Sequence, residues 1–364
     1  MSNKKITLIA LSWKKNPYLK RLVVSYSNYD YHLILADASE EPWTWPAIGS
    51  SGRLTWEYFN AGGDDNPVGS YVHRFIEAIS RVKTEFVTLI DDEEILFPTG
   101  IEKSIKKLQD DKNASCAGGN VATLFSLDQN EIKIGKWGRR SDPFHLLSQN
   151  SFDRIKLVIK EERTANLTYQ VIKTSLAKEF SDILKESNFK YFASPEVFIT
   201  LYLLKNGTWE MGNYPYWLRV TGPAHESLDR WDSGQDYMSN QEAQWIASNI
   251  YPKEELDKEY LYKLIISKWG LPRVSSIKKT NISISIKSLK HKFKMFLKNI
   301  PIVLYFYKKF FRKTIHVPNL VNYFQQFTEL TPESLSECLF FESILQKFPI
   351  GINDSIESSL KFKQ

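Results

Sequence analysis

The stretch FVTLIDDEEILFP, residues 86–98, places four consecutive acids directly after five residues that favour β-structure. An apolar run of this length is typical of a strand buried on both faces in the middle of a parallel sheet. Four carboxylates at the carboxyl end of such a strand cannot all be buried without partners, because removing a lone carboxylate from water is very unfavourable. We therefore expect residues 91–94 to face a cleft, a cation or solvent.

The position of these acids allows two interpretations. In open α/β sheets, ligands bind in the crevice beyond the carboxyl ends of the strands. Carboxylate oxygens at that point suit Mg²⁺ or Mn²⁺, with water and a diphosphate completing the coordination shell. The alternative is a solvated acidic turn that caps a helix beginning near Pro98. The acidic pattern alone does not choose between the two.

The segments around the acidic stretch alternate between predicted strands and predicted helices. Strands are predicted over 5–11, 31–36, 54–58 and 86–90, and helices from 17, over 71–82 and over 99–108. This β-α-β-(β)-α-β-α order is typical of a parallel sheet with covering helices. The sequence therefore predicts an α/β fold with a mostly parallel sheet.

The rest of the chain is less regular. A hairpin region is predicted up to Ile134, strands over 168–172, 209–211 and 216–220, and helices over 235–251 and 253–269. A further helix is indicated where Ser194, a capping-type residue, precedes Pro195 at the first helical position. We expect one large domain, residues 1–250, followed by a helical C-terminal region, residues 251–364.

The cysteines and the apolar segments predict the compartment. Cys116 and Cys338 cannot provide a disulfide framework or a metal cluster, which favours a reducing environment. The first 13 residues, MSNKKITLIALSW, predict a strand and no signal peptide. No uninterrupted apolar stretch reaches the length of a membrane span. We therefore expect a cytoplasmic protein.

The charge is unevenly distributed along the chain. Residues 260–328 contain 14 Lys and Arg and no acid, so the net charge of +6 leaves −8 on the rest. Within this segment, residues 284–313 carry lysines on both sides of an apolar centre that Pro301 divides. That composition is typical of an interfacial helix pair on an anionic bilayer, which predicts peripheral attachment to the inner face of the cell membrane. The alternative is a helical subdomain with solvated lysines. Nucleic-acid binding is not expected, because the aromatic residues lie within apolar runs.

The order of the predicted elements resembles the nucleotide-sugar-binding half of GT-A glycosyltransferases, a Rossmann-like fold. The resemblance is to bacterial family-2-like enzymes of polysaccharide assembly and covers roughly residues 5–225. It rests on residues 35–39 after the second strand, the helix at 71–82, the acids of 90–94 and the P-x-G step at 98–100. A subgroup with three aspartates before this step is the most similar. Glutamates at positions 93 and 94 depart from that pattern and lengthen each side chain by one methylene.

The resemblance implies roles for the acids. Asp37 matches the acid that contacts the base or ribose of the nucleotide, with a turn-forming role as the alternative. Asp91 and Glu93 match the two acids of the D-x-D motif, for ribose and metal. If the motif is aligned one residue later, Asp92 takes the place of Asp91 as the contact of the donor, and Glu94 takes the place of Glu93 as the metal ligand. A bound Mg²⁺ or Mn²⁺ would neutralise the diphosphate leaving group.

The resemblance also implies a catalytic base and two further contacts. Glu196 lies where the family places the carboxylate that takes the proton of the acceptor hydroxyl. The alternative for Glu196 is to complement the helix dipole in the first turn. Arg219 is expected to contact the diphosphate and His225 the metal, and each is equally compatible with an ordinary surface position.

The activity that the resemblance implies is transfer of a sugar from a nucleotide-diphosphate donor to a hydroxyl group. The expected acceptor is a growing bacterial surface glycan or a lipid-linked acceptor, and the expected stereochemical course is inversion. Two other functions stay open. Nucleotidyl transfer on a similar sheet would need a Gly-rich loop after the first strand, and residues 12–17 contain no glycine. The other is a catalytically silent binding or scaffold module of a polysaccharide assembly complex.

Overall fold

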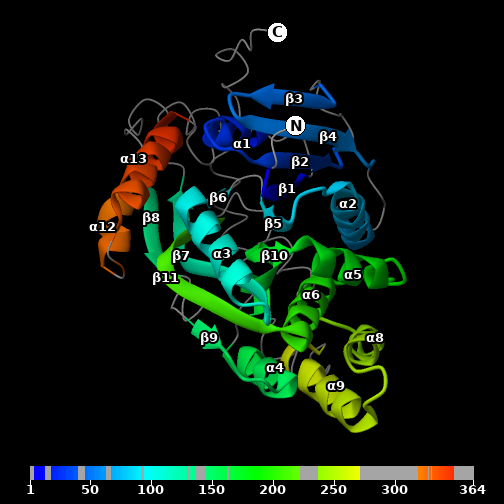
Figure 1. Ribbon diagram of the computed structural model, residues 1–364. Helices are drawn as coiled ribbons and strands as arrows, with labels where there is room; N and C mark the ends of the chain where they lie inside the picture. Colours follow the sequence, from blue (N-terminus) through cyan, green and yellow to red (C-terminus); the bar gives the residue numbers. More distant parts are fainter. Residues whose placement is uncertain are drawn as a thin grey trace, which may run out of the picture.

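The computed structural model confirms the predicted α/β class: a central sheet of 11 strands is covered by helices (Figure 1). The structure describes residues 4–12, 18–39, 46–62, 67–91, 94–128, 131–136, 144–161, 164–221, 237–270, 319–326, 328 and 330–347.

The strands along the sheet are β3 (Ile48–Ser51), β4 (Leu54–Asn60), β2 (His32–Asp37), β1 (Ile6–Ser12), β5 (Phe86–Ile90), β10 (Val171–Lys173), β7 (Ala114–Asp128), β11 (Thr208–Thr221) and β6 (Ile95–Leu96). Off this path, β8 (Glu131–Lys136) pairs with β7, and β9 (Phe144–Leu146) pairs with β11. Strands β4, β2, β1 and β5 run parallel, and so do β7 and β11, whereas the other neighbours pair antiparallel.

The described helices are α1 (Tyr18–Tyr26), α2 (Pro67–Arg81), α3 (Pro98–Asp110), α4 (Ser151–Lys160), α5 (Thr174–Leu184), α6 (Ala193–Asn206), α8 (Asn240–Ile250), α9 (Glu255–Trp269), α12 (Leu320–Gln325), α13 (Pro332–Lys347) and the 3₁₀ helix η2 (Thr164–Tyr169). None of them is both long and apolar enough to cross a bilayer. The predicted interfacial segment, residues 284–313, lies outside the described residues.

The direction of strand addition reverses beside β1. The chain passes from β1 to β2 and β4 on one side, and then returns to β5 on the other side of β1. All five residues of β5 are buried, as expected for a central strand. At such a reversal, the connections after the two neighbouring strands diverge and leave a crevice at their carboxyl ends. The acidic stretch begins at this end of β5.

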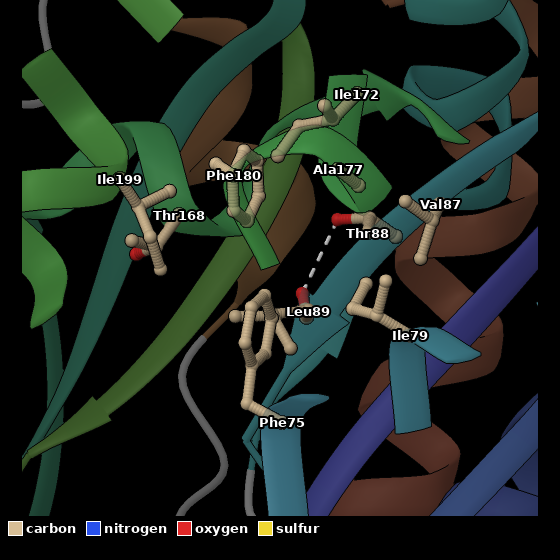
Figure 2. Close-up of a pocket in the computed structure, with 10 residues that line it drawn as sticks. All are labelled: Phe75, Ile79, Val87, Thr88, Leu89, Thr168, Ile172, Ala177, Phe180 and Ile199. Atoms are coloured by element: carbon tan, nitrogen blue, oxygen red, sulfur yellow. Dashed lines mark hydrogen bonds between the residues drawn. The ribbon is translucent and has the colours of Figure 1, made fainter. Parts of the chain in front are cut away.

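A small apolar cavity lies between the sheet and the helices α2, α5 and α6 (Figure 2). Its volume is about 10 Å³, which is room for at most one water molecule. The Phe75 and Phe180 rings stack beside it with centroids 5.9 Å apart. The hydroxyl of Thr88 also lines it and is already hydrogen-bonded to the carbonyls of Leu89 (3.2 Å) and Tyr169 (3.1 Å). The cavity is thus a packing defect of the core and not a substrate site.

The helices α12 and α13, orange to red in Figure 1, pack on the part of the sheet that follows the acidic stretch. The ring of Phe97 meets the rings of Phe324 (5.2 Å) and Phe341 (5.4 Å) edge-on. The same apolar cluster includes Ile95 of β6 and Leu218 of β11. The C-terminal helices therefore form a second hydrophobic core with residues far earlier in the chain. The predicted domain division near residue 250 stays a prediction.

The carboxylate of Glu337 in α13 caps the first turn of α3. It accepts hydrogen bonds from the backbone N–H of Thr99 (2.9 and 3.1 Å) and from the Thr99 hydroxyl (2.6 Å). Burial raises the pKa of Glu337 to about 7, against the opposing effects of these hydrogen bonds and of Lys103, while the charge of Glu102 adds to the rise. The contact between the two helices is therefore expected to respond to pH near neutrality.

Replacing Glu337→Gln is expected to flatten the pH dependence of stability between about pH 5 and pH 8. The pKa in the folded protein lies above the ordinary value, so Glu337 contributes stability below pH 4.5 that is lost as the pH rises through about 7. Over this range we expect the free energy of unfolding of the wild-type protein to fall by about 1–3 kcal/mol more than that of the variant. Urea unfolding at several pH values measures the difference.

The matched control is Glu333→Gln on the same helix. The pKa of Glu333 is lowered by hydrogen bonds to its own backbone and to Thr331, so this residue titrates only at acid pH. Its variant should follow the wild-type slope above pH 5. A slope shared by the wild-type protein and Glu337→Gln would contradict the expectation.

Candidate functional site

The candidate site is built around Asp91, the first residue after β5. The side chain of Asp91 is half-buried, and its Oδ2 accepts a hydrogen bond of 2.9 Å from the hydroxyl of Tyr169, the last residue of η2. The backbone carbonyl of Tyr169 accepts from the hydroxyls of Thr88 (3.1 Å) and Tyr216 (2.7 Å). Tyr169 is thus attached to β5 and β11, and it holds Asp91 at the end of β5.

The last acid of the run, Glu94, is fully buried. Its Oε2 accepts a hydrogen bond of 2.6 Å from the indole N–H of Trp217 in β11. Its Oε1 lies 3.6 Å from the Nε of Arg219, two residues further along the same strand. The N–H of Glu94 donates to the carbonyl of Asp91 (3.0 Å), which joins the described residues on either side of positions 92 and 93. The partners of Glu94 allow a carboxylate to be buried here.

The aromatic rings that bind Asp91 and Glu94 stack on each other. The rings of Tyr169 and Trp217 are nearly parallel, with centroids 4.4 Å apart. Burial raises the pKa of Tyr169 well above its ordinary value, and the negative charges of Asp91, Glu94 and Glu196 raise it further. Glu196, in the first turn of α6, therefore lies close enough to this cluster to act on it electrostatically. Of the predicted site residues, Asp91 contacts Tyr169, and Glu94 and Arg219 lie beside Trp217, whose ring stacks on that of Tyr169.

Asp37 lies at the carboxyl end of β2, opposite Ser12 of β1. It is fully buried. Its Oδ1 accepts from the N–H (2.9 Å) and the hydroxyl (2.6 Å) of Ser39, and its Oδ2 accepts from the hydroxyl of Tyr58 (2.9 Å). The structure therefore shows the turn-forming role for Asp37. The contact of Asp37 with a nucleotide stays a prediction.

Three predicted site residues, Asp92, Glu93 and His225, lie outside the described residues. Within the described ranges, no three His, Cys, Asp or Glu side chains gather into a metal cluster. Asp91 fits a hard cation by its carboxylate chemistry and its partial exposure. Glu94 fits less well, because it is fully buried and already faces the guanidinium of Arg219. Binding of Mg²⁺ or Mn²⁺ stays a prediction.

Sequence reasoning misses two residues that organise the site, Tyr169 and Trp217. Tyr169 falls in a segment predicted as a strand over 168–172, whereas residues 164–169 form η2 and only 171–173 form β10. Trp217 falls in a predicted strand, and nothing in its neighbours indicates a partner 123 residues earlier in the chain. The one available signal is that both residues combine a flat apolar ring with a hydrogen-bond donor.

No protein-family model and no curated protein matches the sequence. Among solved structures, the chain is similar to S. aureus TarS. For TarS 1-349 in complex with UDP-GlcNAc the TM-score is 0.46 with 13% identity, covering 72% of each chain. For TarS 1-349 in complex with UDP the TM-score is 0.43 with 11% identity, covering 97% of this chain and 94% of that one. A likeness with TM-scores under 0.5 does not carry a functional assignment.

Proposed function

We propose that this protein is a glycosyltransferase that moves a sugar from a nucleotide-diphosphate donor to a hydroxyl group of an acceptor, with inversion. The observation that supports the proposal is the gathering of Asp91, Glu94 and Arg219 at the stacked rings of Tyr169 and Trp217, beyond the carboxyl end of β5. This is the carboxyl end of a strand beside the strand reversal, where open α/β sheets bind their ligands. An array of carboxylates with one guanidinium is suited to a donor whose leaving group is a diphosphate.

In the proposed reaction, Glu196 accepts the proton of the acceptor hydroxyl as its oxygen attacks the anomeric carbon of the sugar. The bond between that carbon and the diphosphate oxygen breaks, and the nucleoside diphosphate leaves. A bound Mg²⁺ or Mn²⁺ would neutralise the charge of the leaving group. Asp91 would hold that ion, with Asp92, Glu93 and His225 as the further proposed contacts. Arg219, with 23% of its side chain exposed, would contact the diphosphate as a charged donor.

The proposed acceptor is a bacterial surface glycan or a lipid-linked acceptor, and Asp37 is the proposed contact of the nucleotide. The basic residues 284–313 would attach the protein to the anionic inner surface of the cell membrane, because each basic residue near such a surface adds about 1 kcal/mol. Sedimentation with vesicles tests this part. Equal recovery with anionic and with uncharged vesicles would contradict it.

The experiment that tests the reaction offers the full chain a panel of UDP-, GDP- and dTDP-sugars with Mn²⁺. We expect release of nucleoside diphosphate from one class of donor, and a loss of that release when EDTA removes the ion. The variant Asp91→Asn, which retains the shape but not the charge, is expected to release little. No release from any donor would contradict the proposal and favour a silent binding module.

A further inference from the structure

We infer that helices α12 and α13 form a latch that holds the short strand β6 against β11, and that this latch opens as the pH rises through neutrality. The inference deepens the proposed function and rests on it. The reason is that the corner between β6 and β11 carries Glu94 and Arg219, two residues of the candidate site. Opening of the latch would therefore lower the activity of that site.

The two faces of the β6–β11 pair have different surroundings. Ile95 lies opposite Leu218, and Leu96 lies opposite Trp217. Successive side chains of a strand point to opposite faces of the sheet. Leu96 and Trp217 accordingly belong to the main hydrophobic core. Ile95 and Leu218 pack in the second core, under α12 and α13. The two helices thus cover the face of this pair that is opposite to Trp217.

Strand β11 connects the second core to the candidate site. Leu218 is fully buried in the second core, and its two neighbours in the chain are Trp217 and Arg219. Both neighbours face the carboxylate of Glu94, Trp217 with its indole N–H at 2.6 Å and Arg219 with its Nε at 3.6 Å. Because consecutive residues of a strand move together, loss of the packing on Leu218 would also displace both partners of Glu94.

The backbone of β6 is held by a tyrosine that α13 also contacts. The hydroxyl of Tyr26 accepts a hydrogen bond from the N–H of Leu96 (2.8 Å) and donates one to its carbonyl (2.9 Å). The ring of Phe341 in α13 lies 6.5 Å from the ring of Tyr26 and 5.4 Å from that of Phe97, the residue after β6. Undocking of α13 is therefore expected to loosen β6 before the parallel half of the sheet.

One buried carboxyl group makes this docking depend on pH. Glu337 of α13 accepts hydrogen bonds from the N–H (2.9 Å) and the hydroxyl (2.6 Å) of Thr99 at the start of α3. Burial favours the neutral form of a carboxyl group and raises the pKa of Glu337 to about 7. After undocking, the group would ionise at its ordinary pKa of 4.5. Docking is therefore strongest at acid pH and weakens as the pH rises through about 7.

The other titratable groups around Glu337 do not reverse this direction. On α3, Lys103 lowers the pKa of Glu337 and Glu102 raises it, and both effects are smaller than that of burial. The next acid along α13, Glu342, accepts a hydrogen bond from the N–H of Leu320 (2.6 Å) at the start of α12. Four further groups stay neutral near pH 7 because burial raises their pKa values: Tyr26, Tyr29, Tyr31 and Cys338.

The first measurement asks whether β6 opens while the rest of the sheet stays folded. Peptides over residues 95–99 contain the N–H groups of Leu96, Phe97 and Thr99, which donate to Tyr26, Tyr216 and Glu337. Hydrogen–deuterium exchange of the full chain in low urea compares them with peptides over 6–12 of β1. Local opening exposes little surface, so we expect residues 95–99 to exchange faster than β1 and with a smaller dependence on urea. Equal protection and equal urea slopes would overturn the inference.

The second measurement repeats this exchange at two pH values, corrected for the intrinsic pH dependence of exchange. Between about pH 5.5 and pH 8 we expect the protection of residues 95–99 to fall by about tenfold or more in the wild-type protein. Glu337→Gln cannot ionise and should show no such fall. Glu333→Gln is the matched control on the same helix, and it should follow the wild-type protein, because the pKa of Glu333 is lowered. A fall in Glu337→Gln equal to that of the wild-type protein would overturn the inference.

A packing variant tests the latch independently of Glu337. The ring of Phe324 in α12 is fully buried and meets that of Phe97 at 5.2 Å. We expect Phe324→Ala to lower the protection of residues 95–99 by about tenfold or more at both pH values. Leu339→Ala, on the exposed side of α13, should leave it unchanged. Wild-type protection in Phe324→Ala would show that the two helices do not hold β6.

Turnover separates a failure of the latch from a failure of the proposed function. With the donor found by the panel above, we expect the ratio of turnover at about pH 8 to that at about pH 5.5 to be higher in Glu337→Gln than in the wild-type protein. If the two ratios are equal, regulation by the latch is wrong and the reaction stands. If no donor is turned over but the exchange of residues 95–99 responds as expected, the proposed reaction is wrong and the latch stands.

Discussion

Glu196→Gln is expected to lower turnover of the nucleotide-sugar donor by about 10²- to 10⁴-fold, the range that a general base contributes. Glutamine has almost the shape of glutamate but cannot accept the proton of the acceptor hydroxyl. Glu196 lies in the first turn of α6, and its charge acts on Tyr169, the residue that holds Asp91. Release of nucleoside diphosphate under saturating donor and acceptor measures the effect on the rate of turnover.

The control for this prediction separates the base from its structural alternative. Glu255 also lies in the first turn of a helix, α9, with 79% of its side chain exposed. If Glu196 only complements the helix dipole, Glu196→Gln and Glu255→Gln should differ little, and both should cost at most about 1 kcal/mol of stability. Wild-type turnover in a folded Glu196→Gln protein would show that Glu196 is not the base.

Phe341→Ala is expected to lower the free energy of unfolding by about 3–5 kcal/mol. The Phe341 ring is fully buried and meets the rings of Phe97 (5.4 Å) and Tyr26 (6.5 Å). Truncation removes this contact area and leaves a cavity that the strand β6 and the helix α1 cannot close without moving. Urea unfolding followed by circular dichroism measures the change.

The control on the same helix is Leu339→Ala, because Leu339 is 54% exposed. It makes a similar change in helix propensity without opening a cavity, so we expect a loss of less than about 1 kcal/mol. If the two variants lost the same amount of stability, α13 would contribute little to the core. The packing of Phe341 described above would then not be a stabilising contact in solution.

The parallel half of the fold could be predicted from the sequence because its signals are local. The apolar runs of β1, β2 and β5 are continuous, as expected for buried strands, and each is found where it is predicted. Two helices, α4 and α5, are not among the predicted elements. In α5, Ala177, Phe180, Ser181 and Leu184 are buried at helical spacing, so this signal is present in the sequence.

The antiparallel half of the sheet is less predictable because the boundaries of its strands depend on the neighbouring strands with which they pair. The strands predicted at 209–211 and 216–220 are one strand, β11, whose register with β7 shifts between Met211 and Trp217. A polar, irregular segment in the middle of a strand has the composition of a turn, and its extended conformation depends on pairing with neighbouring strands, chiefly β7. The packing of α12 and α13 on Phe97 is likewise a contact between segments far apart in the chain, and the composition of these segments does not predict it.

The candidate site also has residues that the sequence predicts and residues whose surroundings depend on tertiary contacts. Asp91 and Glu196 could be proposed from residue type and position, and the structure shows Asp91 hydrogen-bonded to Tyr169 and Glu196 in the first turn of α6. Glu94 reads like the other acids in the sequence, yet it is fully buried beside Trp217. Adjacent carboxylates are chemically alike in the sequence, and the fold distinguishes Glu94, which is buried, from Asp91, which is half-buried.

The cap that Glu337 places on Thr99 joins residues 238 positions apart, which has a consequence for synthesis of the chain. At about 5–20 residues per second, a ribosome needs about 10–50 seconds to travel that distance. Throughout this interval the nascent polypeptide holds Phe97 and its apolar neighbours without the helix that later covers them. We therefore expect that any chaperone that recognises such surfaces would engage this chain late in translation, and that Ile95 and Phe97 would be covered only when α13 docks.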